Sequence, residues 1–208
     1  MADLEYGWRH PSGARTKSRP RPAQIDVVTR APMPAASLQL PSSAVIRPAG
    51  PRDLAALLEI EASCFESDRL SERSFRRLLS GESAGTLVEC TQRHVRGYAL
   101  VLYRRGSRTA RLYSFAVRRE CRGQGIAKRL MTEMLRLAAA RGCTRMRLEL
   151  RRDNVAARRL YERAGFRLFA EAPRFYEDRM DALRLERPLQ PGRTTRALPI
   201  AGKGKLAA

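Results

Sequence analysis

Two glycines, Gly123 and Gly125, lie where a strand-like pattern at residues 111–117 passes into a helix-like pattern. Glycine lets a backbone approach a ligand closely because it has no Cβ. The first turn of a helix offers free N–H groups and the positive end of the helix dipole, and Arg122 and Lys128 add cations. We interpret this turn as a site for a phosphate-bearing ligand. The alternative is a glycine-rich turn that only starts a helix.

Neither of two common nucleotide-binding patterns fits this turn. The dinucleotide pattern G-x-G-x-x-G requires a third glycine, and that position is Lys128. The phosphate-loop pattern G-x-x-x-x-G-K-[ST] is absent from the sequence. The turn therefore indicates phosphate binding by some other arrangement.

A second group of candidate residues follows on a strand and a helix. Apolar and charged residues alternate over residues 146–151, so Glu149 points away from the apolar face of that strand. Asn154 and Tyr161 are seven residues apart, about two helical turns, and share a stripe of the next helix. A helix whose N-terminal amide side chain and later phenol face one cleft can hold a ligand and supply a proton. The alternatives are a helix cap for Asn154, a core aromatic for Tyr161 and an arginine partner for Glu149.

The four cysteines indicate neither a metal site nor a disulfide framework. They lie far apart with no C-x-x-C pair, which argues against zinc and, in 208 residues, against a disulfide scaffold. They are also poor nucleophile candidates, because no histidine accompanies them beyond His10 and His94. We expect no metal and a reducing, cytoplasmic setting. The cysteines are Cys64, Cys90, Cys121 and Cys143.

The chain is strongly basic, with 41 Lys and Arg against 21 Asp and Glu and a net charge of +20. Such a field attracts polyanions, including nucleic acid, ribosomes and phosphate-rich cofactors. Arginines on solvated faces are an equal alternative, so charge alone assigns no function. No apolar run approaches the roughly 18 residues of a membrane span, and the first residues lack the apolar region of a secretory signal.

Composition divides the chain into three parts. Residues 1–44 are rich in Pro, Ser and Arg without sustained periodicity, and residues 190–208 are similar, so we expect two flexible basic tails. Residues 45–189 show the pattern β-α-α-β-β-β-α-β-α-β-β, which predicts a mixed sheet covered by helices. Asp53 is the expected cap of the first helix, and Ser71 opens the second.

Taken together, residues 45–189 resemble the GNAT superfamily of acetyltransferases. The stretch R-G-Q-G-I-A at 122–127 matches the family's acetyl-CoA motif [QR]-x-x-G-x-[GA]. The stretch L-E-L-R-R-D-N-x-A-A-x-x-L-Y-E-x-x-G-F at 148–166 is similar to that of the ribosomal-protein-alanine N-acetyltransferases. The resemblance implies an α/β fold with a largely antiparallel mixed sheet and helices on both faces. It also implies a V-shaped splay between the fourth and fifth strands, at 111–117 and 146–151.

The resemblance also implies a role for each candidate residue. Acetyl-CoA would be the co-substrate, with Asn154 on its pantetheine chain. Glu149 would be the general base, acting through water, and Tyr161 the general acid for the departing thiolate. The backbone of Phe115, Ala116 and Val117 would pair with the pantetheine arm. The pyrophosphate would lie on the turn formed by Arg122, Gly123, Gln124, Gly125, Ile126, Ala127 and Lys128.

The acceptor is the least specified part of the reaction. An α-amine has a pKa of about 7.7–8.0 and a Lys amine of about 10.4, so deprotonation at pH 7 costs about 1 against about 4.6 kcal/mol. This favours the N-terminal amine of a protein or peptide, including a ribosomal one. The groove is expected between the first two helices and residues 173–178. There, residues 68–71 (D-R-L-S) replace the family's Pro-Trp-Ser, which leaves a different peptide, a lysine or a small amine as alternative acceptors. The net charge of +20 and the Arg-rich tails leave a ribosome-binding or nucleic-acid-binding module on an inactive fold as a further alternative.

Overall fold

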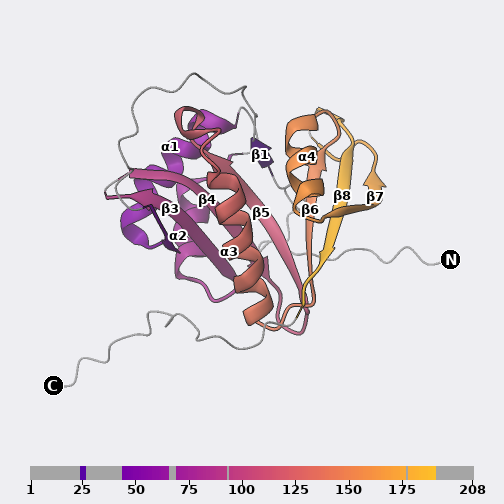
Figure 1. The fold of residues 1–208 in the computed structure, drawn as a ribbon, viewed down its shortest axis with the longest axis horizontal. Helices are drawn as coiled ribbons and strands as arrows, with labels where there is room; N and C mark the ends of the chain where they lie inside the picture. Colours follow the sequence, from indigo (N-terminus) through magenta and orange to yellow (C-terminus); the bar gives the residue numbers. More distant parts are fainter. Residues whose placement is uncertain (1–23, 27–43, 66–68, 93, 177, 191–208) are drawn as a thin grey trace.

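The computed structural model describes residues 24–26, 44–65, 69–92, 94–176 and 178–190. A mixed sheet with the strand order β2-β3-β4-β5-β6-β8-β7 forms its centre, and β1 pairs with β5 outside that order (Figure 1). The strands are β1 (Gln24–Asp26), β2 (Val45–Pro48), β3 (Ala84–Thr91), β4 (His94–Tyr103), β5 (Thr109–Val117), β6 (Arg145–Arg151), β7 (Arg167–Ala172) and β8 (Ala182–Pro188). Only the β5–β6 and β1–β5 pairings are parallel.

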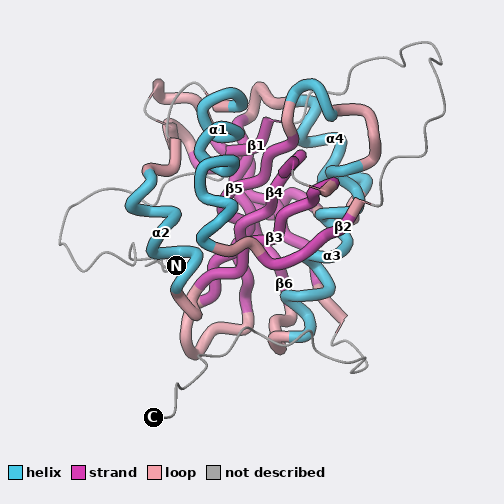
Figure 2. Tube along the Cα trace, turned by 90° about the vertical axis from the view of Figure 1, so that its left-hand side faces the viewer, coloured by secondary structure: helices cyan, strands magenta, loops and turns pink. Residues whose placement is uncertain are grey.

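Helices cover both faces of the sheet (Figure 2). One face carries α1 (Leu54–Cys64) and α2 (Glu72–Ser80), and the other carries α3 (Ile126–Ala140) and α4 (Val155–Arg163). Two short 3-10 helices, Pro51–Asp53 and Arg119–Cys121, precede α1 and α3. Each face has its own apolar core, since alternate residues of a strand point to opposite faces.

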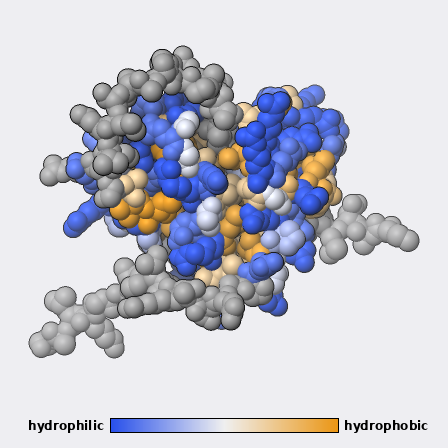
Figure 3. All heavy atoms as spheres, viewed as in Figure 1, coloured by the Kyte–Doolittle hydropathy of each residue, from blue (hydrophilic) through white to orange (hydrophobic). Residues whose placement is uncertain are grey.

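The two cores are bounded by the helices that cover them. Leu130 and Met134 of α3 and Tyr161 of α4 are fully buried in the first core. Ile60 of α1 and Phe75 of α2 are fully buried in the second. Most of the surface outside them is hydrophilic, with apolar residues visible between the two halves of the molecule (Figure 3).

The sheet opens between β5 and β6. These parallel strands pair only from Thr109 to Arg111 on β5 and from Arg145 to Arg147 on β6, although β5 continues to Val117. Beyond Arg111 the two strands diverge, which is the predicted splay between 111–117 and 146–151. The opening receives β1, whose residues pair with β5 at Ser114, Phe115 and Ala116.

The predicted element order is confirmed over residues 45–189, with one difference in detail inside that range and one strand outside it. Asp53 occupies the predicted N-cap position of α1, but its side chain makes no capping hydrogen bond to that helix: its carboxylate accepts a hydrogen bond from the backbone N–H of Gly50 at 2.8 Å and pairs with Arg47. The strand Gln24–Asp26 falls inside the segment for which the sequence predicts no regular structure, because its partner is 90 residues away in the chain. The other residues of the two predicted tails lie outside the described residues.

The cap of α2 follows the sequence expectation. Ser71 Oγ accepts a hydrogen bond from the N–H of Ser74 at 3.2 Å, as a helix N-cap does. Among the described residues, no helix is long and apolar enough to cross a membrane.

Candidate active site

The glycine-rich turn presents a row of unpaired backbone N–H groups at the start of α3. Gly123 and Gly125 have φ values of 81° and 73°, in the left-handed region that glycine adopts at low cost. Among the described residues, no hydrogen bond is made by the amides of residues 123–128. Residues 123–125 are exposed, whereas Ile126 is buried and anchors the helix. The turn therefore has the geometry of an anion site at a helix N-terminus.

A buried carboxylate behind the turn holds it in place. Glu89 on β3 is fully buried and forms ion pairs with Arg96 and with Arg129, the latter at 2.7 Å. The same two arginines hold Gln124, since Arg96 donates to its side-chain oxygen at 3.1 Å and Arg129 to its backbone oxygen at 2.9 Å. Sequence reasoning missed this cluster, because its members come from β3, β4 and α3 with no shared motif.

Arg122 and Lys128 flank the turn in different ways. Arg122 is half-buried and donates from Nε to the backbone oxygen of Val117 at 3.3 Å, which joins the turn to the end of β5. Lys128 is exposed in the first turn of α3, next to the half-buried Ala127. The cations expected from the sequence thus lie at the turn, although one of them also has a structural contact.

The β5 strand leads from the sheet to this turn. Phe115, Ala116 and Val117 are buried, and β4 pairs with one edge of β5 at all three. The opposite edge faces the splay, because β6 has already diverged there. At Phe115 and Ala116 that edge is paired with β1.

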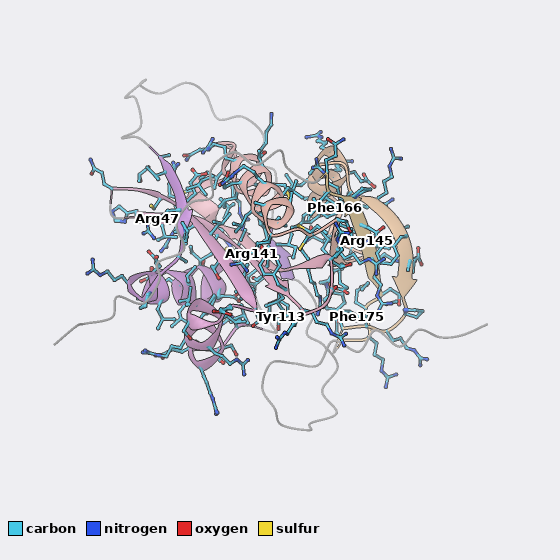
Figure 4. All side chains as sticks on the ribbon, turned by 90° about the horizontal axis from the view of Figure 1, so that it is seen from below. Arg47, Tyr113, Arg141, Arg145, Phe166 and Phe175 are labelled. Carbon is cyan, nitrogen blue, oxygen red and sulfur yellow. The ribbon has the colours of Figure 1, made fainter. Side chains whose placement is uncertain are left out.

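Glu149 lies on the face of β6 that is remote from α3 and α4, as the alternation predicts. Its Oε2 lies 2.9 Å from both Nε and Nη2 of Arg111, and both side chains are largely buried. The structure shows no hydrogen bond to Oε1 among the described residues. In Figure 4, Tyr113 and Phe175 lie on this same side of the sheet, whereas Phe166 lies on the α4 side.

Tyr161 is fully buried beneath the opposite face of β6. Its ring packs edge-on against Phe166 with centroids 5.4 Å apart, and its hydroxyl has no hydrogen-bond partner among the described residues. Burial, reinforced by nearby Tyr176, raises the pKa of Tyr161 well above 10, so the phenol keeps its proton at neutral pH. Asn154 Oδ1 accepts a hydrogen bond from the N–H of Ala157 at 3.0 Å and caps α4.

The structure therefore shows each of the contacts that the alternative interpretations predicted. Asn154 caps a helix, Tyr161 is a core aromatic and Glu149 is paired with an arginine. None of these contacts excludes a role in chemistry. Glu149 and Tyr161 lie on opposite faces of β6, the strand that borders the splay. A ligand that entered the splay from the glycine-rich turn would run between them.

A buried polar cluster adjoins the splay on the α1 side. Tyr98 donates its hydroxyl hydrogen bond to Glu61 Oε1 and lies 2.6 Å from Ser114 Oγ. Glu61 Oε2 also accepts from the N–H of Leu70 at 3.2 Å, which fixes the segment between α1 and α2. Burial, and after it the Glu61 charge, raise the pKa of Tyr98 well above 10. Sequence patterns gave no sign of this cluster, because Glu61 occupies a helix position that periodicity assigns to the core.

The segment expected to form the far wall of the acceptor groove, residues 173–178, lies in the connection between the end of β7 at Ala172 and the start of β8 at Ala182. Tyr176 is buried beneath the guanidinium of Arg151, 5.0 Å from the ring centroid, and Arg151 pairs with Asp178 at 2.8 Å. Phe175 is half-buried, 5.8 Å from the guanidinium of Arg184. Of the opposite wall, residues 66–68 lie outside the described residues.

All four cysteines are free thiols. Burial raises the pKa of the Cys121 thiol and that of the Cys143 thiol. A raised pKa reduces the thiolate fraction, which is the reactive form. Among the described residues, no group of three or more His, Cys, Asp or Glu side chains could hold a metal ion.

Comparison with known proteins defines the class to which this site belongs. Residues 54–166 match the Acetyltransferase (GNAT) family, and the chain belongs to that family. The chain is thus an acetyltransferase enzyme, and GNAT acetyltransferases use acetyl-CoA as the acetyl donor.

Three similar proteins illustrate the relationship. An uncharacterized N-acetyltransferase of Methanocaldococcus jannaschii is 32% identical over 143 residues, which cover 67% of this chain and 88% of that protein. A Bacillus subtilis protein with the provisional name [ribosomal protein bS18]-alanine N-acetyltransferase is 27% identical over 137 residues, covering 66% and 89%. The crystal structure of the ribosomal-protein-S18-alanine N-acetyltransferase from Escherichia coli has a TM-score of 0.64 at 24% identity, covering 74% of this chain and 100% of that one. The last comparison supports the fold alone and confirms the predicted GNAT architecture.

Proposed function

We propose that this enzyme transfers the acetyl group of acetyl-CoA to the N-terminal α-amine of a protein or peptide. The observation that carries the proposal is the row of bare amides at residues 123–128, which follows directly on the β5 edge of the splay. The pyrophosphate of the cofactor would accept hydrogen bonds from these amides, with Lys128 contributing charge. The pantetheine arm would then lie along Phe115, Ala116 and Val117, and Asn154 would bind it from α4.

The proposed chemistry uses Glu149 and Tyr161 on the two sides of this groove. Glu149 accepts a proton from the amine through water, and Oε1, which has no other hydrogen bond among the described residues, is the oxygen suited to that. The amine nitrogen then bonds to the thioester carbonyl carbon and the C–S bond breaks. The departing thiolate takes the proton of the Tyr161 hydroxyl. Burial keeps the Tyr161 hydroxyl protonated at neutral pH, so a proton is present there when the leaving group forms.

The acceptor is assigned from the cost of deprotonation and from the relatives. At pH 7 an α-amine needs about 1 kcal/mol to lose its proton and a Lys amine about 4.6 kcal/mol, so a single carboxylate–water relay is better matched to the α-amine. The name of the Bacillus subtilis relative, an alanine N-acetyltransferase of a ribosomal protein, points the same way. The net charge of +20 would favour approach to a ribosomal, RNA-rich target in the cytoplasm.

In this proposal the catalytic domain comprises residues 45–189, and residues 1–44 and 190–208 are basic extensions to it. Lysine side chains and small amines are the alternative acceptors. An inactive fold used only to bind nucleic acid is the alternative to the proposed transfer itself.

Two measurements test the proposal. Isothermal titration should show acetyl-CoA binding in the micromolar range, and the absence of both heat and a thermal shift would reject it. An acetylation assay on an array of peptides with free or blocked N-termini, and with or without internal lysines, should release CoA thiol only where the N-terminus is free. Mass spectrometry would locate the acetyl group, and modification of internal lysines alone would move the assignment to a lysine acceptor.

A further inference from the structure

The splay is occupied by a segment of the chain itself. The strand β1 runs parallel to β5 with Gln24 opposite Ser114, Ile25 opposite Phe115 and Asp26 opposite Ala116. It also lies against β6. Figure 1 shows it in the opening between β5 and the β6–α4 unit.

The strand β1 provides backbone partners for the edge of β5 that β6 leaves unpaired. Phe115 and Ala116 are fully buried, and β6 has diverged too far to pair with them. Backbone N–H and C=O groups in such a place are costly unless they are hydrogen-bonded. A strand laid along this edge supplies the missing partners, as strands added to open sheet edges do elsewhere.

The same edge is the one assigned above to the pantetheine arm of acetyl-CoA. Alternate residues of a strand direct their N–H and C=O to the same edge, so β1 and pantetheine compete for the backbone groups that β5 presents to the splay around Phe115 and Ala116. We propose that β1 is an internal competitor that occupies the cofactor groove and must leave it before acetyl-CoA binds. This inference rests on the proposed function, since it requires that the groove is a cofactor groove.

The form of β1 suits a displaceable competitor. A strand of three residues gains few hydrogen bonds while its ordering costs conformational entropy, so its pairing is weak. Its connection to the catalytic domain is covalent, through residues 27–44, so it competes at a concentration that is fixed by that connection rather than by the solution. Cofactor affinity is then reduced by the fraction of molecules in which the groove is open.

The test compares three full-length proteins: the unchanged chain, a triple proline variant and a triple alanine variant. In the first variant Gln24→Pro, Ile25→Pro and Asp26→Pro remove every backbone N–H of β1 and so weaken its pairing with β5. In the second, the same three positions become alanine, which keeps all three N–H groups. If β1 closes the groove in nine of ten molecules, the proline variant should bind CoA about tenfold more tightly in isothermal titration, and the alanine variant should bind like the unchanged chain.

Hydrogen exchange supplies a readout that does not depend on activity. Without CoA, the amides of β5 around Phe115 should exchange faster in the proline variant than in the other two proteins. In addition, a synthetic peptide of residues 20–30, added to the proline variant, should restore the competitor and weaken CoA binding. This experiment requires no further substitution. Thermal melting should show that all three proteins are folded.

The outcomes separate the two proposals. If all three proteins bind CoA with the same affinity and the peptide has no effect, the competitor is refuted and the proposed function stands. If none binds CoA although all are folded, the proposed function fails and the competitor fails with it.

Discussion

The glycine-rich turn and the region around Glu149 and Tyr161 differ in exposure and in hydrogen bonding. The turn is exposed at residues 123–125 and its amides carry no hydrogen bonds among the described residues. By contrast, the Tyr161 hydroxyl is fully buried and Glu149 is paired with the buried Arg111. An open, bare turn suits the capture of a charged cofactor from water, whereas a closed pair of proton-transfer groups suits chemistry on a substrate that excludes water.

The largest expected effect comes from removing the Tyr161 hydroxyl. Tyr161→Phe should lower kcat by about 10²–10⁴-fold, the usual contribution of a positioned acid. It should leave CoA affinity and the melting temperature nearly unchanged, since a buried hydroxyl without a partner does not stabilise the fold. Steady-state kinetics, titration and thermal melting measure the three quantities.

Tyr103 supplies the control for that substitution. Its hydroxyl is also buried without a hydrogen-bond partner among the described residues, and burial raises its pKa to about 12, yet it lies at the end of β4 beneath Arg141. Tyr103→Phe should leave kcat unchanged. Equal losses in the two variants would mean that Tyr161 acts through packing rather than as an acid.

The second-largest effect is expected from removing the charge of Glu89, whose ion pairs hold the turn in place. Glu89→Gln leaves Arg96 and Arg129 without their buried counter-charge, and breaking a buried ion pair in this way costs about 3 kcal/mol, the low end of the usual range because Arg129 is 46% exposed. CoA affinity should fall together with stability. Glu72→Gln, which removes an exposed pair with Arg76 on α2, should cost less than about 0.5 kcal/mol in urea denaturation. If the two variants lose similar free energies of unfolding, Glu89 does not stabilise the turn.

The contrast between the two regions also explains what could be predicted from the sequence. The turn is built from contiguous residues, so Gly123, Gly125 and the start of α3 could be recognised from a short motif. The element order followed from periodicity, because the apolar faces of α2, α3 and β6 each have their expected repeat. The splay was predicted only through the family resemblance.

The remaining features join residues that are far apart in the chain. The partner of Glu149 is Arg111, 38 residues away, and Glu89 and Arg129 are separated by 40. The pairing of β1 with β5 joins residues 90 positions apart and rests on backbone groups that every residue possesses. Periodicity and motifs describe local order, so they carry no information about such pairs.

A smaller effect is expected at Gly125 itself. Gly125→Ala introduces a Cβ at a φ of 73°, which costs about 1–2 kcal/mol, and that Cβ would lie 3.1 Å from Arg129 Nη1. Gly106→Ala has a similar backbone cost at a φ of 75°, but nothing lies within 4 Å of its Cβ. Both variants should melt at a lower temperature, and only Gly125→Ala should weaken CoA binding, by about tenfold for 1.4 kcal/mol. Equal CoA affinity in the two would show that the turn does not contact the cofactor.

The smallest expected effect lies outside both regions, where Arg47 and Asp53 join β2 to the start of α1. Arg47 donates to both carboxylate oxygens of Asp53, at 2.7 and 2.8 Å, and this contact holds the pKa of Asp53 below its ordinary value of 3.8. Asp53→Asn should cost about 1 kcal/mol at pH 7, because the exposed side of the pair is screened by water.

The pH dependence of that cost distinguishes charge from hydrogen bonding. A carboxylate with a depressed folded-state pKa stabilises the fold above the unfolded-state pKa, and this stabilisation is lost as the pH falls through the lower folded-state value. The free energies of unfolding of the unchanged chain and of Asp53→Asn should therefore differ at pH 7 and 5, begin to converge below pH 3.8, and become equal only below the depressed folded-state pKa of Asp53. A difference that persists after Asp53 has become protonated would assign the cost to something other than the charge interaction with Arg47. CoA affinity should be the same in both proteins at pH 7, because the described side-chain hydrogen bonds of Asp53 are to Arg47 and Gly50 and do not involve residues 122–128.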